Sequence, residues 1–216
     1  MMKKIISALA IAAILYTNGQ AIAKDSENSF VVGGNIEYSS PTGDVRKMRG
    51  TKTKNTYGNI SNFLSIGYDH KLSSKTSIGI ESGVHYVSEV VKIRGNNGWA
   101  ATNVLSFPFL LKGKFDLPGT ERFNVFSKLG YGFNQIKQKG THSGGIPINV
   151  EANHNKFKFM PVAAFGIGYK INKVDLFAQY QYNWLRFTNT LDKHISYGED
   201  RGGLSRISMG ASYSFS

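Results

Sequence analysis

Two residues near the C terminus have the types and the spacing that nucleophilic catalysis requires. His194 and Ser196 are separated by one residue in the segment KHIS, and a histidine beside a serine can act as the general base that activates the hydroxyl. A serine whose base is not oriented by a third group is a poor nucleophile. The pair is therefore a weak indication of hydrolysis, and two ordinary loop residues are the plainer interpretation.

Metal and thiol chemistry have less support. The chain contains no cysteine, which excludes zinc-thiolate sites and cysteine nucleophiles. His142 and His154 are too isolated to suggest a metal site. The segment HSGG at residues 142–145 has neither the lysine nor the strand-to-helix context of a phosphate-binding loop. We therefore expect no metal and no cofactor.

The elements that position the functional residues are indicated by an alternation of apolar with small or polar residues. Within residues 162–187, for example, Phe165 and Ile167 share one face, and Gly166 and Gly168 share the other. A period of two is typical of β-strands and not of helices. Eight segments alternate in this way: residues 30–38, 60–69, 78–86, 104–115, 123–134, 157–170, 174–184 and 206–215.

The connections between these segments alternate in length. Three are of tight-turn length and composition, at residues 71–75, 117–120 and 171–173. The other four are long, at residues 39–59, 88–100, 135–155 and 188–203. Short turns at one end and long loops at the other are typical of an up-and-down β-barrel in a bacterial outer membrane. Eight strands then place both chain ends at the turn end.

The first residues have the pattern of a secretory signal peptide. Two lysines precede an apolar stretch at residues 5–16, and the segment AIA at residues 21–23 is a small-residue cleavage site. The apolar stretch is too short to span a bilayer. We expect residues 1–23 to be removed by cleavage after Ala23, leaving residues 24–216 as a single barrel domain. Without cysteine, an exported domain of this size must be held by its hydrogen-bonded scaffold.

The alternation alone does not say which face of the barrel is outside, since a soluble lipocalin-like barrel has its apolar face inside. The interior of an eight-stranded barrel is just wide enough to be filled by side chains, and the large apolar residues here are too many for it. The face of Gly, Ser, Asn and Gln fits. We therefore predict an all-β, eight-stranded antiparallel transmembrane barrel with its apolar face in lipid, three short periplasmic turns and four long extracellular loops.

Several segments resemble the OmpA-type and opacity-protein-like family of small eight-stranded outer-membrane barrels. They are LGYGFN at residues 129–134, FGIGYKI at 165–171, AQYQYNW at 178–184 and RISMGASYSF at 206–215. The resemblance implies location in the outer membrane and a C-terminal strand whose last aromatic residue is read by the barrel-assembly machinery. That role would belong to Phe215, with Tyr213 behind it. Family members include structural barrels, adhesins and surface antigens.

Charged residues on the inward face predict a polar network that fills the lumen. Burying a charge costs several kcal/mol unless it is paired, so we expect these residues to satisfy one another, with Lys128 as the partner of Glu81. The network residues are Glu37, Asp69, Glu81, Lys112, Lys128 and Arg206, with Asp175 on the same face. A gated, porin-like channel would need the same residues and is the alternative.

The segment KHIS also resembles the His-x-Ser pair of lipid A deacylases of the PagL type, which are eight-stranded barrels too. The resemblance implies an acidic residue in the last strand that orients the histidine. Residues 204–215 contain no Asp or Glu. We therefore expect no enzymatic activity, and lipid A deacylation by His194 and Ser196 is the weaker alternative.

The first long connection contains the most basic segment of the chain, DVRKMRGTKTKN at residues 44–55. Its bases are Arg46, Lys47, Arg49, Lys52 and Lys54, opposed only by Asp44. The chain as a whole carries a net charge of +12, and an exported basic protein meets phosphorylated lipid or acidic glycans more often than nucleic acid. We expect a monomer whose loops interact with surfaces, with lipopolysaccharide or a host glycan as partner and no nucleic acid. A solvated loop is the plainer interpretation of this segment.

Overall fold

The computed structural model describes residues 28–43, 54–95, 98–120, 122–142, 147–148, 158–187 and 200–215. These residues form strands joined by turns. The strands are β1 (Asn28–Gly43), β2 (Lys54–Tyr57), β3 (Asn59–Lys71), β4 (Thr76–Gly95), β5 (Gly98–Asp116), β6 (Phe123–His142), β7 (Pro147–Ile148), β8 (Lys158–Ile171), β9 (Val174–Phe187) and β10 (Asp200–Phe215). Nothing in this part of the chain is a helix of the length and hydropathy needed to cross a membrane.

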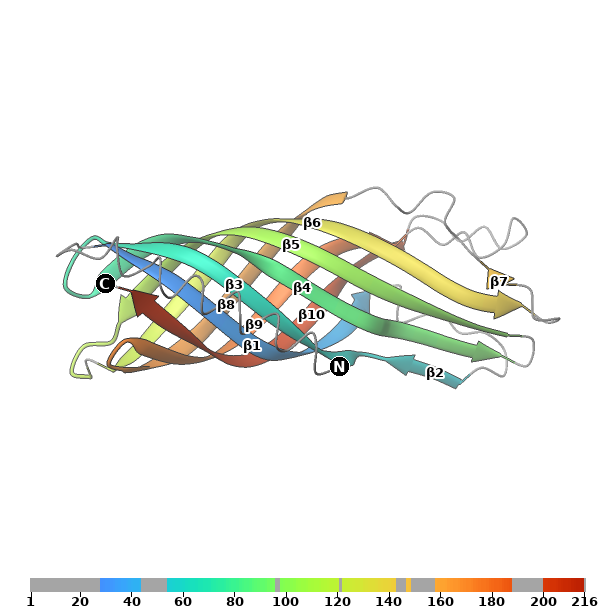
Figure 1. Ribbon diagram of the computed structural model, residues 1–216, viewed down its shortest axis with the longest axis horizontal. Coiled ribbons are helices and arrows are strands. Elements are labelled where there is room, and N and C mark those ends of the chain that lie inside the picture. The colour runs from blue at the N-terminus through green and yellow to red at the C-terminus, as the bar shows by residue number, and fades with distance from the viewer. Residues whose placement is uncertain are drawn as a thin grey trace.

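The eight long strands close into a barrel, as predicted. Each pairs antiparallel with its neighbour in the order β1, β3, β4, β5, β6, β8, β9 and β10. The ring closes between the first and last strands, where the register runs from Phe30 opposite Phe215 to Gly43 opposite Gly202. Figure 1 shows these strands tilted around one long axis, with the end of β10 on the left and β2 and β7 on the right.

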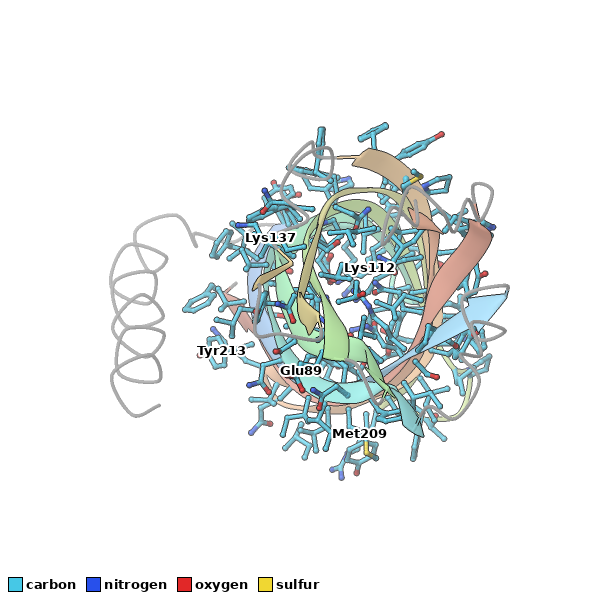
Figure 2. The ribbon with its side chains drawn as sticks, turned by 90° about the vertical axis from the view of Figure 1, so that its right-hand side faces the viewer. Glu89, Lys112, Lys137, Met209 and Tyr213 are labelled. Carbon is cyan, nitrogen blue, oxygen red and sulfur yellow. The ribbon has the colours of Figure 1, made fainter. Side chains whose placement is uncertain are left out.

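The two faces of the wall differ as the alternation predicts. Outward side chains such as Met209, Ile60 and Leu129 are 71 %, 68 % and 64 % exposed, whereas the inward Asn134 and Asn183 are fully buried. Figure 2, which looks along the barrel, shows Lys112 within the ring of strands and Met209 and Tyr213 outside it. The apolar band is therefore on the outside, where only lipid can cover it.

The end of the barrel that carries the short turns is called the turn end here, and the opposite end the loop end. Between β3 and β4, the amides of Leu72 and Ser73 donate to the Thr76 carbonyl. Between β8 and β9, Asn172 has a φ of 56°, a conformation that asparagine tolerates in a tight turn. Arg122 Nη1 donates to the Tyr169 hydroxyl at 3.2 Å, and this bond raises the pKa of Arg122.

At the loop end the strands run further than predicted. The expected loop at residues 88–100 is wrong, because β4 continues to Gly95 and β5 begins at Gly98, with these two glycines paired. Similarly, β6 extends to His142 and β10 begins at Asp200. The placement of all five bases of the segment 44–55 in a loop is also wrong for Lys54, which begins β2 opposite Arg94. Backbone pairing continues because Val, Lys, Ile and Arg alternate at residues 91–94, up to Gly95.

A bulge in β4 separates the part of the strand that belongs to the barrel wall from the outer part that continues to Gly95. Val87 lies opposite Val104 and Val91 opposite Thr102, so three residues of β4 face Asn103 alone. The Asn103 Oδ1 accepts hydrogen bonds from the Glu89 amide at 2.8 Å and from the Ser88 hydroxyl at 3.3 Å. These hydrogen bonds hold the bulge in place at Glu89, whose φ of 50° lies in the left-handed region that residues other than glycine rarely adopt. The bulge therefore has its own polar support and is a built feature of the wall.

Candidate functional site

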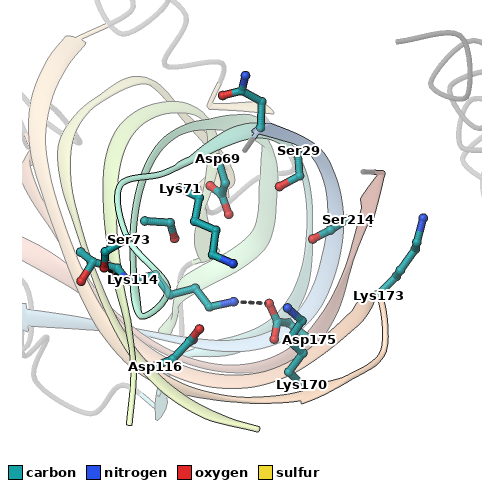
Figure 3. A pocket seen from close by; sticks show the side chains of 13 residues that line it. Ser29, Asp69, Lys71, Ser73, Lys114, Asp116, Lys170, Lys173, Asp175 and Ser214 are labelled. Carbon is teal, nitrogen blue, oxygen red and sulfur yellow. Dashed lines mark hydrogen bonds and ion pairs between the residues drawn. The ribbon is translucent and has the colours of Figure 1, made fainter. Parts of the chain in front are cut away.

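The lumen opens at the turn end in a cavity of about 250 Å³. Lys114 Nζ lies 2.5 Å from Asp175 Oδ2 in this mouth (Figure 3), and Asn124 Nδ2 donates to the other Asp175 oxygen at 3.3 Å. Lys112 Nζ lies 2.6 Å from Asp69 Oδ2 at the same end. The two β5 lysines nearest the turn end, Lys112 and Lys114, are therefore paired with acids of β3 and β9.

Above this mouth the lumen narrows around Lys128. Its Nζ donates to Glu81 Oε1 at 2.8 Å and lies 5.1 Å and 5.6 Å from the ring centres of Phe126 and Phe177. An ammonium group over aromatic faces is electrostatically favourable, more so when it is shielded from water. A cavity that these four side chains line together with their neighbours has a volume of about 40 Å³, which is room for only a few water molecules.

Inward glycines make this arrangement of rings possible. A Cβ on Gly166 would lie 2.5 Å from an atom of the Phe126 ring, and one on Gly83 would lie 2.6 Å from the Phe63 ring. These rings occupy the volume that larger side chains would need. The Gly-rich inward face is therefore matched to inward aromatic residues and does not line an open pore.

A third charged group lies closer to the loop end. Arg206 is 1 % exposed, and its Nε lies 3.9 Å from Glu37 Oε2. His85 Nε2 lies 3.7 Å from the same carboxylate oxygen and 2.8 Å from the Ser61 hydroxyl. These residues come from four strands, β1, β3, β4 and β10. Ser61 and His85 lie within hydrogen-bond distance of each other, whereas His85 and Arg206 are both too far from the Glu37 carboxylate for a hydrogen bond.

The Ser61, His85 and Glu37 set has the residue types of a hydrolytic triad but not its geometry. Both Ser61 and Glu37 approach the same histidine nitrogen, Nε2, whereas a triad needs the acid on the other nitrogen to orient the base. All three residues are buried, so no substrate can reach the serine. The three residues therefore fill the lumen, with the Glu37 carboxylate placed near Arg206.

An apolar layer closes the lumen above these charges. Its six side chains are at most 8 % exposed, and Met160 packs against them. They come from β4, β5, β6, β9 and β10: Val87, Val90, Val104, Ile136, Leu185 and Leu204. Water and ions that entered from the loop end would have to pass this layer before reaching Arg206 or Glu37. An apolar constriction is a strong barrier to ions because nothing replaces their hydration shell.

From the level of the apolar layer to the mouth, many buried polar atoms have no hydrogen-bond partner within the described part of the chain. They are Asn35 Oδ1, Ser39 Oγ, Asp69 Oδ1, His85 Nδ1, Ser106 Oγ, Asn134 Oδ1, Gln179 Oε1, Asn183 Nδ2, and Nε and Nη2 of Arg206. Buried polar atoms of this kind are normally satisfied by ordered water. The polar part of the lumen therefore has the chemistry of a small hydrated compartment.

The structure brings the six predicted network residues into the lumen as three charge pairs. These pairs are Lys112 with Asp69, Lys128 with Glu81, and Arg206 with Glu37. Lys114, the partner of Asp175, was not predicted, although Lys114 follows Lys112 on the same face. The apolar layer was not predicted either, because inward Val and Leu residues are few and scattered along the chain.

The other predicted functional residues are placed as follows. Four bases of the segment 44–55, Arg46, Lys47, Arg49 and Lys52, lie outside the described residues, as do His194, Ser196 and His154. Tyr213 and Phe215 lie at the turn end, where the Phe215 ring is 4.7 Å from that of Tyr213 and 6.0 Å from that of Phe30.

Comparison with known families gives one match that covers almost the whole chain. The profile of the outer membrane protein beta-barrel domain matches residues 8–215. A comparison with curated proteins finds no match.

Solved structures with similar folds include three bacterial proteins. OprG of Pseudomonas aeruginosa has a TM-score of 0.48 at 14 % identity, over 88 % of this chain and 99 % of its own. The Neisserial surface protein A has a TM-score of 0.49 at 12 % identity, over 85 % and 96 %. Ail of Yersinia pestis, solved with the heparin analogue sucrose octasulfate, has a TM-score of 0.48 at 11 % identity, over 87 % and 99 %.

Proposed function

This chain belongs to the outer membrane protein beta-barrel family, and we propose that it serves there as a closed barrel whose working surface is its outer end. In this family the turn end lies in the periplasm and the loop end lies outside the cell. The protein is therefore an outer-membrane barrel with its apolar layer toward the exterior. The proposed role is structural or surface-interacting, and the lumen is not a route for solutes.

The observation that carries this proposal is the apolar layer over paired charges. Val104 and Leu204 are fully buried within it, and the next groups inward are an arginine and a carboxylate that are themselves almost completely buried. Further inward, the Lys128 ammonium is held by Glu81 and two rings. A permeating ion would have to displace each of these contacts in turn, so the lumen is a filled core.

The outer end is then the surface that remains for interaction. The strands β4, β5 and β6 run past the rest of the wall, extended by β2 and β7 at their margins (Figure 1). Binding residues are common on loops carried by a rigid scaffold. The basic segment at residues 44–55 joins β1 to this extension, which fits an anionic partner such as lipopolysaccharide or an acidic host glycan.

Single-channel recording of the purified, folded protein in planar bilayers tests the closed lumen. We expect no discrete conductance steps in the wild type at voltages where a large porin, used as a positive control, opens fully. The Lys128→Gln variant serves to assign any current to the lumen, because the Lys128 side chain lies inside the lumen beside Glu81 and two aromatic rings. Wild-type steps that change in size in this variant would overturn the proposal.

A second candidate function, a narrow channel, is favoured by the hydrated compartment. Buried polar atoms of Asn35, Asn134, Gln179 and Asn183 lack protein partners among the described residues, and a chain of waters along them would connect the mouth to the apolar layer. Channel function then requires the apolar layer to move. The same recordings distinguish the two candidates. Lipid A deacylation by His194 and Ser196 is the weakest candidate, and it would reveal itself as a loss of acyl mass from lipid A in cells that express the protein.

A further inference from the structure

The cavity at the turn end, called the mouth pocket here, has no part in the proposed function. Its volume is about 250 Å³, and an engineered apolar cavity of about 150 Å³ is enough to hold benzene. Its lining comes from the turn ends of seven wall strands, β1, β3, β4, β5, β8, β9 and β10, and from the turns beside them. The mouth pocket is therefore large enough for a small organic molecule and is surrounded by polar residues.

Two neighbouring rows of inward residues cross β3, β4 and β5 at this end of the lumen. In the deeper row, Asp69 lies opposite Gly79, and Gly79 lies opposite Lys112. Lys112 Nζ reaches across the glycine to Asp69 Oδ2 at 2.6 Å. The glycine allows this contact, because a Cβ at Gly79 would collide with the Asp69 carboxylate. The deeper row therefore has an acid on β3 that neutralises a base on β5.

The next row toward the turns has a base in the place of that acid. Lys71 lies opposite Ser77, and Ser77 lies opposite Lys114, so the serine has a lysine on each side. With neighbouring strands about 4.8 Å apart, the two lysine backbones are separated by roughly 10 Å. Figure 3 shows the ends of the Lys71 and Lys114 side chains directed into the middle of the mouth. The outer row therefore places two like charges on either side of one hydroxyl group.

Both lysines of the outer row can bind a further acceptor. Lys114 Nζ lies 2.5 Å from Asp175 Oδ2, but an ammonium group has three N–H donors, so donors remain. The exposed Lys71 side chain makes no hydrogen bond or ion pair with another described residue. An anion above Ser77 could therefore accept from Lys71 and Lys114 together without breaking the bond between Lys114 and Asp175.

The charge of the mouth favours an anion. Among the described residues, five bases and three acids either line the mouth pocket or pair with a residue that does: Lys71, Lys112, Lys114, Lys170 and Lys173 against Asp69, Asp116 and Asp175. Asp69 and Asp175 are already paired with lysines. Asp116 follows Lys114 by two positions on β5, so it lies beyond the outer row, toward the turns. A cleft with an excess of one charge concentrates ions of the opposite sign.

Hydroxyl groups supply further donors around the mouth pocket. Ser73 Oγ accepts hydrogen bonds from the amides of Lys75 and Thr76 at 3.2 Å and 3.1 Å, so its own O–H is left to donate. Ser29 of β1 and Ser214 of β10 also line the pocket. Hydrogen bonds from such donors to a charged oxygen are short and strong. The lining can therefore bind both an anionic group and the polar remainder of the molecule that carries it.

We propose that the mouth pocket binds the phosphate group of a small phosphate ester, above Ser77 and between the ammonium groups of Lys71 and Lys114. The phosphate completes the outer row as the Asp69 carboxylate completes the deeper one. Its three strong acceptor oxygens allow it to accept from both lysines and the serine hydroxyl at once. The ester is either a soluble molecule or the headgroup of a phospholipid in the leaflet at the turn end. The site lies at the opposite end of the barrel from the proposed interaction surface and does not depend on that proposal.

Calorimetric titration of glycerol 3-phosphate into the folded, full-length protein in maltoside detergent tests the site, with glycerol and sodium chloride at matched ionic strength as blanks. We expect saturable binding by the wild type. Lys71→Gln should bind about fivefold more weakly, the loss expected for one solvent-exposed charge pair. The matched control is Lys75→Gln, which removes the same charge from the same hairpin but from a residue outside the pocket lining, and it should bind like the wild type.

Native mass spectrometry with phosphatidylglycerol distinguishes the two sources of the phosphate. If the source is a lipid, phosphatidylglycerol remains bound to the wild type and to Lys75→Gln but is lost from Lys71→Gln, and the soluble ester binds weakly. If the source is soluble, glycerol 3-phosphate shows the dependence on Lys71 and phosphatidylglycerol does not. Either result supports the site, because both assign the phosphate to the same lysine.

The variant Lys71→Glu gives a second, independent measurement. Its carboxylate can pair with Lys114 across Ser77, as Asp69 pairs with Lys112, so without phosphate its midpoint of thermal unfolding should equal or exceed that of the wild type. Inorganic phosphate should raise the midpoint of the wild type and leave that of Lys71→Glu unchanged. Equal binding of both probes by the wild type, Lys71→Gln and Lys75→Gln would overturn the proposal. So would the absence of binding of either probe to the wild type.

Discussion

Lys128 Nζ lies 2.8 Å from Glu81 Oε1 at mid-height in the lumen, with both side chains almost fully buried. The two residues come from β6 and β4, which are not neighbours in the wall because β5 lies between them. The pair therefore braces the barrel across its interior. The rings of Phe126 and Phe177 hold the same ammonium from other directions.

Replacing one member of this pair should cost more than replacing both. Glu81→Ala leaves the Lys128 ammonium buried without its anion, and we expect a loss of about 3 kcal/mol or more in the free energy of unfolding. Glu81→Ala combined with Lys128→Met should recover part of that loss, since Met fits the aromatic surroundings. Urea titration of the barrel in lipid vesicles measures both variants, and additive losses would mean that the pair contributes no coupling energy.

The apolar layer should behave as a conventional hydrophobic core although it lies inside a membrane protein. Leu204 is fully buried in the layer, so Leu204→Ala should lower the free energy of unfolding by about 2–5 kcal/mol through lost contacts and a cavity. Met209→Ala, on the same strand but facing lipid, is the control and should cost distinctly less. Equal losses in the two variants would show that the layer is not packed.

The close approach of rings to inward glycines gives a third prediction. Gly166→Ala places a Cβ 2.5 Å from both the Phe126 ring and the Ala178 carbonyl oxygen, and overpacking of this kind costs about 1–3 kcal/mol. Gly113→Ala meets nothing nearer than Ser127 Oγ at 3.9 Å and should be close to neutral. The refolding yield and the urea midpoint of the two variants make the comparison.

The basic segment at residues 44–55 should bind an anionic partner through charge. Replacing Arg46, Lys47, Arg49, Lys52 and Lys54 with Gln should weaken attachment to lipopolysaccharide or to surfaces coated with sulfated glycan, and leave heat-modifiable folding intact. The wild-type interaction should weaken as salt is raised, because the Debye length is only about 10 Å at 0.1 M. If mutant and wild type bind equally at low salt, the segment is an ordinary solvated connection.

The leader should be absent from the protein in its membrane. We expect mass spectrometry of the outer-membrane fraction to give a chain that begins at Lys24, because the signal-peptide pattern predicts cleavage after Ala23. An intact Met1, or recovery of the chain in the soluble periplasm, would contradict this prediction. The Ala21→Arg and Ala23→Arg variants should block processing and accumulate the longer precursor.

The eight-stranded barrel was predictable because alternation is a local property. Residues such as Ile207 and Met209 on one face and Ser208 and Gly210 on the other indicate a strand and its lipid-facing side without any knowledge of partners. Even the missed hairpin at residues 88–100 had this signal in Val91 to Arg94. The bulge interrupts it, because Ser88, Glu89 and Val90 all lie opposite Asn103, although these two extra residues leave the alternation in the same phase on either side.

The pairing of charges depends on geometry that alternation does not contain. Whether Lys112 or Lys114 faces Asp175 depends on the stagger of β5 against β9, which are not neighbours, and on where each long side chain ends inside the lumen. The period of the sequence therefore predicts which face of a strand a residue occupies, whereas its ion-pair partner depends on how the closed sheet places strands that are not neighbours.

The closure of the ring between its first and last strands constrains how the barrel can enter the membrane. Phe30, near the start of the described chain, is registered with Phe215 at its end, so this seam completes the ring only when every other strand is also in the sheet. An incomplete sheet would present two open edges to hydrocarbon, where each unsatisfied backbone group costs several kcal/mol. Insertion into hydrocarbon is therefore favourable only if the ring closes as well, and damage to the last few residues threatens the whole barrel instead of fraying one end.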